Sequence, residues 1–72
     1  MSELAKSILA HLRVYRYGEY DEIVAYYKRP ENGAVWKGDV LDAVGCLRRA
    51  GLVKNYGAGS FAGVELTEKG KR

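Results

Sequence analysis

The sequence predicts an α+β fold in which three helices are followed by a β-hairpin. Three segments have apolar residues at helical spacing, and residues that favour helix ends lie next to them. The last third instead has two short apolar runs on either side of a glycine-rich loop, which is typical of a hairpin. A chain of 72 residues has room for one core, so 1–72 is predicted to be a single domain.

The first predicted helix runs from Ser2 to Arg16. Ser2 is a favourable N-cap, and Gly18 is expected to break the helix. Residues Tyr17–Tyr20 are expected to form a short extended connector. The inward stripe of this helix consists of Leu4, Ala5, Ile8, Leu9, Leu12 and Tyr15.

A second helix is predicted over Asp21–Lys28, with Asp21 as its cap. Pro30 ends this helix, because the residue before a proline is pushed out of the helical region, and 30–33 then forms a turn. The predicted inward residues are Ile23, Val24 and Tyr27.

The third helix is predicted over Lys37–Ala50, and Gly51 is suited to end it. Its inward stripe consists of Val40, Val44 and Leu47. Strands are expected over Leu52–Tyr56 and Val64–Leu66, joined by a flexible loop, and the charged end at 69–72 is expected to fray.

The formal charge of +3 is distributed unevenly along the chain. Residues 1–36 contain five Lys or Arg and five acidic residues, whereas residues 37–72 contain seven Lys or Arg and four acidic residues. All of the excess positive charge lies in the second half, which favours a surface there that faces a polyanion.

Two segments carry a resemblance to a known family. Residues 47–53 read Leu-Arg-Arg-Ala-Gly-Leu-Val, and residues 64–70 read Val-Glu-Leu-Thr-Glu-Lys-Gly. Their order and separation resemble the winged helix-turn-helix family of DNA-binding regulators. In that family a helix ends in Leu-x-x-x-Gly-Leu-Val, a two-stranded wing follows, and the returning strand ends in Leu-Thr-x-x-Gly.

The resemblance implies a recognition helix over Lys37–Ala50 that enters the DNA major groove, with Asp21–Lys28 as the supporting helix. The connection Arg29–Trp36 is longer than the turn usual in the family, which leaves the angle between these helices open. The expected function is sequence-specific binding of double-stranded DNA by a small dimeric transcriptional regulator. A winged-helix protein-interaction module, or an RNA-binding winged helix, remains the alternative.

The outer face of the third helix is unusual for a DNA reader. It carries Gly38, Asp42, Gly45, Cys46 and Arg49, with Lys37, Leu41 and Arg48 on one flank. The acidic residues Asp39 and Asp42 repel phosphates, and Asp reads only cytosine. The glycines either leave the face flat for close approach of a groove or helix, or have no role on a solvent face.

The predicted DNA contacts are drawn from both helices and the first wing strand. They are Lys28, Arg29, Lys37, Gly38, Leu41, Asp42, Gly45, Arg48, Arg49 and Lys54, and the C-terminal Lys69, Lys71 and Arg72 are expected to neutralise phosphates. Arg48 and Arg49 also suit the negative end of the helix dipole, which explains them equally well. The tip of the predicted wing, residues 56–63, contains no Lys or Arg, so strong insertion into the minor groove is not expected. Phe61, at this tip, is expected to fold onto the core.

A second stripe on the first helix favours a homodimer. It consists of Ser7, Ala10, Val14 and Tyr17. An ordinary partly exposed face is the alternative. The six tyrosines, at 15, 17, 20, 26, 27 and 56, are mostly expected in the core with their hydroxyls at its rim.

Other classes of protein find no support. His11 is the single histidine, Cys46 is a lone thiol, and no phosphate-binding glycine loop is present, so neither an enzyme nor a metal, cofactor or small-molecule ligand is predicted. No apolar run approaches the roughly 20 residues of a membrane span. The first apolar stretch contains acidic and basic residues, unlike a secretory signal, so a cytoplasmic protein is expected.

Overall fold

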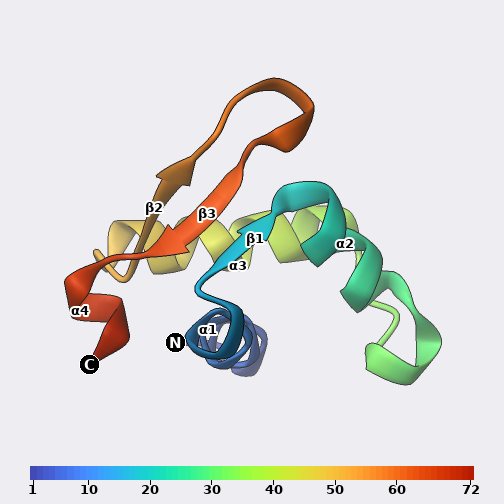
Figure 1. The fold of residues 1–72 in the computed structure, drawn as a ribbon. Coiled ribbons are helices and arrows are strands. Elements are labelled where there is room, and N and C mark those ends of the chain that lie inside the picture. Colours follow the sequence, from blue (N-terminus) through green and yellow to red (C-terminus); the bar gives the residue numbers. More distant parts are fainter.

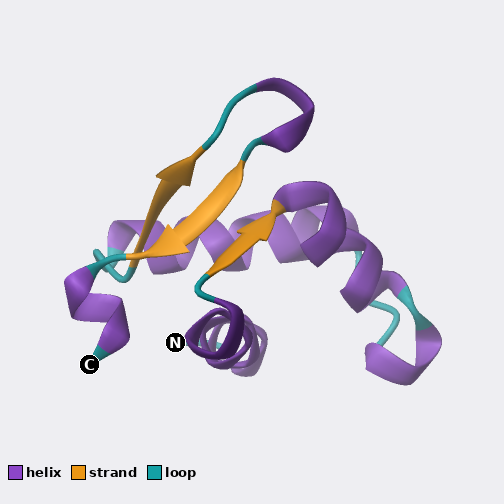
Figure 2. Cartoon of the chain, in the orientation of Figure 1, coloured by secondary structure: helices purple, strands orange, loops and turns teal.

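The computed structural model describes all 72 residues and confirms the α+β class (Figure 1). It contains four α-helices and a three-stranded antiparallel sheet (Figure 2), so β1 and α4 are additions to the predicted elements. In chain order the elements are α1 (Glu3–Tyr15), β1 (Tyr17–Glu19), α2 (Tyr20–Lys28), the 3-10 turn η1 (Pro30–Asn32), α3 (Lys37–Arg49), β2 (Val53–Tyr56), the 3-10 turn η2 (Gly59–Phe61), β3 (Gly63–Leu66) and α4 (Glu68–Lys71).

Helix α1 begins as predicted and ends one residue early. The Ser2 hydroxyl accepts a hydrogen bond from the Ala5 N–H at 3.1 Å, as an N-cap does. The helix stops at Tyr15 because Arg16 adopts a left-handed conformation with φ of 67°. Gly18 is therefore not the helix breaker; it is buried within β1. Tyr15 is 66% exposed, so its predicted inward position is wrong.

Helix α2 begins at Tyr20, because the preceding Glu19 takes the N-cap position. The predicted cap at Asp21 is therefore wrong: Asp21 lies in the first turn, where its charge still suits the helix dipole. The helix ends before Pro30 as predicted, and η1 leads to Gly33 with a left-handed φ of 110°. Hydrogen bonds from the Val35 N–H to the Tyr27 carbonyl, 2.7 Å, and from Ala34 to Arg29 order the connection to α3.

The third helix matches its prediction closely. Helix α3 ends at Arg49, Ala50 is the C-cap, and Gly51 follows in the left-handed region at φ of 77°. The Leu52 N–H then donates to the Leu47 carbonyl at 3.0 Å, which turns the chain out of the helix and into β2.

The predicted hairpin is present, and it is part of a larger sheet. Strand β3 lies between β1 and β2, with Val53 opposite Leu66 and Lys54 opposite Glu65. On the other edge β1 pairs with β3 through Tyr17 and Glu65, so the expected connector is a strand. Figure 1 shows the hairpin rising from the C-terminal end of α3, with β1 joining α1 to α2 beside it.

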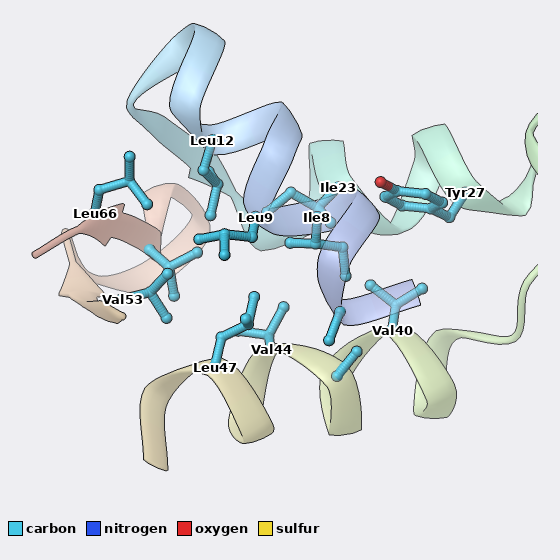
Figure 3. Close-up of a cluster of buried hydrophobic side chains, with 13 residues drawn as sticks. Ile8, Leu9, Leu12, Ile23, Tyr27, Val40, Val44, Leu47, Val53 and Leu66 are labelled. Atoms are coloured by element: carbon cyan, nitrogen blue, oxygen red, sulfur yellow. The ribbon is translucent and has the colours of Figure 1, made fainter. Parts of the chain in front are cut away.

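The core is formed by side chains from α1, α2, α3 and the sheet, which point toward one another in Figure 3. The buried set confirms most of the predicted stripes: Ala5, Ile8, Leu9, Leu12, Ile23, Tyr27, Val40, Ala43, Val44, Leu47, Val53, Val64 and Leu66. No polar or charged side chain is buried. None of the helices combines the length and apolar content that a bilayer crossing requires.

Two aromatic predictions are wrong. Tyr27 is the only buried tyrosine, and its hydroxyl lies 2.7 Å from the Ser7 hydroxyl. The other tyrosines are half-buried or exposed, because one small core is already filled by aliphatic side chains. Phe61 is 67% exposed, because η2 holds it at the tip of the hairpin, away from the core.

The end of the chain is helical, in contrast to the fraying expected at 69–72. Helix α4 is capped by the Thr67 hydroxyl, which accepts from the Gly70 N–H at 3.1 Å. The Lys69 ammonium donates to the Ala50 carbonyl at 2.8 Å, and the Arg13 guanidinium donates to the Gly70 carbonyl at 3.2 Å. These bonds tie the last turn to the C-terminal end of α3 and to α1.

Leu47 is fully buried where α3 meets the hairpin, so Leu47→Ala removes a central core side chain. We expect the free energy of unfolding to fall by about 2–5 kcal/mol, from lost burial and the cavity left behind. Leu41→Ala, on the exposed side of the same helix, should change it by roughly 0.5 kcal/mol at most. Denaturant titration of both variants checks this, and equal stabilities would contradict the packing described.

Two glycines give an opposed pair of substitutions. A Cβ at Gly63 would overlap the Gly18 carbonyl oxygen and lie 2.7 Å from the Glu19 Cα, so Gly63→Ala should destabilise the protein by about 1–3 kcal/mol. A Cβ at Gly45 meets only the Arg49 side chain, at 3.5 Å, so Gly45→Ala should stabilise α3 by about 0.5–1 kcal/mol. Melting temperatures that shift in the same direction would refute this contrast.

Candidate nucleic-acid interface

The outer face of α3 has the composition that the helical projection predicts. Lys37, Gly38, Asp42 and Arg49 are exposed, and Gly45 is half-buried. The nearest side-chain atom to the space beside Gly45 is the Arg49 guanidinium, so this arginine lies back along the helix. Nothing approaches within 4 Å of the space beside Gly38. The face is therefore open, with one carboxylate, Asp42, between its basic ends.

Arg48 connects the C-terminal end of α3 to two other elements. Its guanidinium donates to the Tyr20 hydroxyl at 2.8 Å, and that hydroxyl donates to the Asn55 Oδ1 at 3.0 Å. The three residues come from α3, α2 and β2, and they line a shallow groove beside the hairpin. Arg48 thus presents a cation whose position is fixed by hydrogen bonds rather than by an acidic side chain.

A second group of cations lies at the junction of α2 and α3. Lys28 and Lys37 line the same groove, and Arg29 follows Lys28 at the end of α2. None of these three side chains forms an ion pair, and the same holds for Arg48 and Arg49. We call these five residues, Lys28, Arg29, Lys37, Arg48 and Arg49, the basic surface.

Three of the four remaining predicted phosphate contacts, Lys54, Lys69 and Lys71, are engaged within the protein, whereas the Arg72 side chain forms no hydrogen bond or ion pair. The Lys54 ammonium lies 3.3 Å from a Glu65 carboxylate oxygen on the neighbouring strand, which offsets its charge. Lys71 pairs with Glu68, and Lys69 caps the Ala50 carbonyl. The sequence count of positive charge in the second half therefore overstates the charge that these residues offer to a partner.

The tip of the hairpin is uncharged but ordered. Tyr17 donates from its hydroxyl to the Phe61 carbonyl at 2.9 Å, and its ring packs edge-on against Tyr56 with centroids 4.5 Å apart. Loss of hydration, and then the charge of Glu19, raise the pKa of the Tyr17 phenol above its ordinary value. Phe61 is held outward at the tip.

The structure contains most of the predicted dimer stripe, but not Tyr17. Ser7, Ala10 and Val14 lie along one groove, and Val14 is 73% exposed. Tyr17 is not part of this helical stripe, because α1 ends at Tyr15 and Tyr17 belongs to β1. Its place in the groove is taken by four aromatic rings that the sequence did not associate with the dimer stripe, those of His11, Tyr15, Tyr26 and Tyr27. The ring centroids lie 4.7 Å apart for His11 and Tyr15, 5.5 Å for His11 and Tyr26, and 5.0 Å for Tyr26 and Tyr27.

One exposed aromatic residue is absent from the predicted contacts. Trp36 precedes α3 as its N-cap residue, where no side-chain capping bond is formed, and it is 80% exposed. The available signal was the single tryptophan placed directly before Lys37, at the start of the proposed recognition helix. Its exposure was not readable from periodicity, because it lies outside every helical stripe.

The single histidine and the single cysteine lie on different helices, His11 on α1 and Cys46 on α3. No group of three or more His, Cys, Asp or Glu side chains is placed to hold a metal ion. His11 packs against tyrosine rings, and Cys46 is a half-buried free thiol on α3. Comparison with protein-family models, with curated proteins and with solved structures finds no match.

Proposed function

We propose that this chain is a winged helix-turn-helix domain that binds double-stranded DNA in a sequence-specific manner, as a small dimeric transcriptional regulator. In this proposal α3 enters the major groove and the β2–β3 hairpin is the wing. The element order and the position of the hairpin at the end of α3 support this assignment. The pairing of β1 with β3 supports it further, because a wing anchored to the core keeps a fixed orientation relative to α3.

The basic surface is the observation that carries the proposal. Five cations along α3 and at the end of α2 have no acidic partner. Elsewhere Lys6, Lys54 and Lys71 form ion pairs, Arg13 and Lys69 donate to backbone carbonyls, and only Arg16 and Arg72 are similarly free. A cation without an internal partner gains most from a phosphate, because binding then releases counterions without breaking an ion pair. In this assignment the two ends of α3 hold phosphates and set the orientation, while the face between them approaches the bases.

A protein partner is the second candidate, and specific features favour it. Asp39 and Asp42 lie on α3, so their carboxylates repel a polyanion that approaches this helix. The hairpin tip has no cation, so it does not attract a polyanion either. The open face around Gly38 and Gly45 also fits another helix. An RNA-binding winged helix would need the same basic surface as a DNA-binding one. Competition between duplex DNA and duplex RNA for the protein shows which of the two it binds more tightly.

Arg49→Ala should weaken binding to every duplex sequence and reduce the salt slope of the affinity by about 0.9, the value for one lost phosphate contact. Asp42→Asn should instead raise nonspecific affinity, because it removes a negative charge beside the phosphates. Lys54→Ala should have a smaller effect than Arg49→Ala, since Glu65 already offsets Lys54. Mobility shifts on a duplex at two salt concentrations measure all three.

Lys6→Ala is the matched control, because it removes the same unit charge from the exposed side of α1, outside the basic surface. Its slope should equal that of the wild type. If neither the wild type nor Asp42→Asn shifts a duplex at low salt, DNA binding is refuted and the protein-interaction module takes its place. Weakened binding of a protein partner by Asp42→Asn would then be the expected finding.

The proposed dimer places the α1 groove against a second copy. Val14→Glu should yield a folded monomer, because Val14 is exposed in one protomer but would bring a charge into an apolar contact in the pair. Ser60→Glu, in the hairpin loop, is the control for the added charge and should remain dimeric. Sedimentation at micromolar concentration decides, and a wild type that is already monomeric there would end the dimer proposal.

A further inference from the structure

An apolar groove with two lysines lies where α2 meets the start of α3. It has a volume of about 400 Å³ and is lined by Val24, Lys28, Ala34, Val35, Trp36 and Lys37. Trp36 has the largest exposed fraction among the large hydrophobic side chains of the chain. A large indole left in water is unfavourable unless a partner covers it, because aromatic rings carry much of the burial energy in interfaces.

The groove is a fixed feature of the chain. The Val35 N–H donates to the Tyr27 carbonyl at 2.7 Å, and Val35 packs against the core, so the residue before Trp36 is anchored. On the other side α3 begins at Lys37. The backbone of Trp36 is therefore held between two ordered segments, and the ring remains uncovered at the edge of the groove.

The charge around the groove defines the chemistry of its partner. Lys28 comes from the last turn of α2 and Lys37 from the first turn of α3, and neither forms an ion pair. No acidic side chain lines the groove. A partner must therefore offer negative charge next to an apolar surface. Each strand of a DNA duplex does so along its whole length, because apolar sugar surfaces lie between successive phosphates.

We propose that Trp36 is an apolar DNA contact, packing on one strand of the duplex while Lys28 and Lys37 hold the phosphates beside it. This inference rests on the proposed DNA binding and extends it to a residue outside the α3 face. It divides the affinity at this end of α3 into an ionic part, from the lysines, and a part insensitive to salt, from the indole. The two parts respond differently to salt, which makes them separable.

The chain has a single tryptophan, so its emission reports on this groove alone. A labelled duplex is titrated with protein at two salt concentrations, and both the anisotropy of the label and the emission of Trp36 are recorded. We expect the emission to change with the same saturation as the anisotropy. Trp36→Ala should lower the affinity by about tenfold, the scale of truncating a tryptophan buried in an interface, with the salt slope unchanged.

Lys37→Ala is the matched ionic variant, and it should reduce the salt slope by about 0.9. Trp36→Phe should retain most of the wild-type affinity, since a smaller aromatic ring still packs on the strand. Thermal melting should show the Trp36 variants to be as stable as the wild type, because the ring is exposed. A lower affinity of Trp36→Ala then reflects the lost contact with DNA.

Two outcomes overturn the proposal and are distinct from each other. In the first outcome the wild type binds the duplex without a change in its Trp36 emission, and Trp36→Ala keeps the wild-type affinity. Trp36 then does not contact DNA, and the proposed DNA binding stands. A reduced salt slope of the affinity of Trp36→Ala would also contradict the proposed apolar contact, because removing an uncharged ring should leave the number of phosphate contacts unchanged. If no anisotropy change occurs with the wild type at low salt, DNA binding itself fails, and an acidic protein partner becomes the occupant to seek.

Discussion

The close approach of β1 and β3 is the constraint on which the rest of this structure depends. Gly63 lies against the backbone of Gly18 and Glu19, so closely that a Cβ at this position would overlap a carbonyl oxygen. This contact lets a three-residue strand pair with the hairpin and makes β3 the centre of the sheet. Val64 and Leu66 then face the helices, and the core closes around them.

The proposed interface is anchored at both ends, by different parts of the fold. At the C-terminal end of α3, Arg48 reaches Tyr20 and Asn55, so one hydrogen-bonded chain joins the helix, the start of α2 and the hairpin. The chain after α3 is also tied to α4: Thr67, the N-cap of α4, donates to the Gly51 carbonyl at 2.6 Å, and Lys69 donates to the Ala50 carbonyl. At the N-terminal end, hydrogen bonds of the connection through η1 hold the backbone directly before Trp36. A surface held at both ends loses little conformational freedom when it binds.

The basic surface carries only a few cations, and acidic groups lie close to it. Intramolecular pairs offset Lys54 and Lys71, while Asp42 divides the cations of α3 into two groups. In the proposed complex with DNA, long-range attraction is therefore modest, and the proposed apolar contact of Trp36 supplies part of the affinity. The uncharged hairpin tip, with Phe61 outward, follows the same pattern. Specificity then depends on how closely the open face of α3 fits its partner.

Features whose causes lie within a few residues could be predicted from the amino-acid sequence. The periodic stripes of α1 and α3, the Ser2 cap, the stop at Pro30 and the left-handed turn at Gly51 are local preferences, and the structure has all of them. Other features follow from tertiary contacts. They are the pairing of β1 with β3 and of Lys54 with Glu65, and the exposure of Tyr15, Phe61 and Trp36. The absence of Tyr17 from the α1 stripe is a further one, because Tyr17 belongs to β1. Each of these depends on which distant segment lies alongside. Burial and charge pairing are set by neighbours in space, and a pattern read along one segment does not contain them.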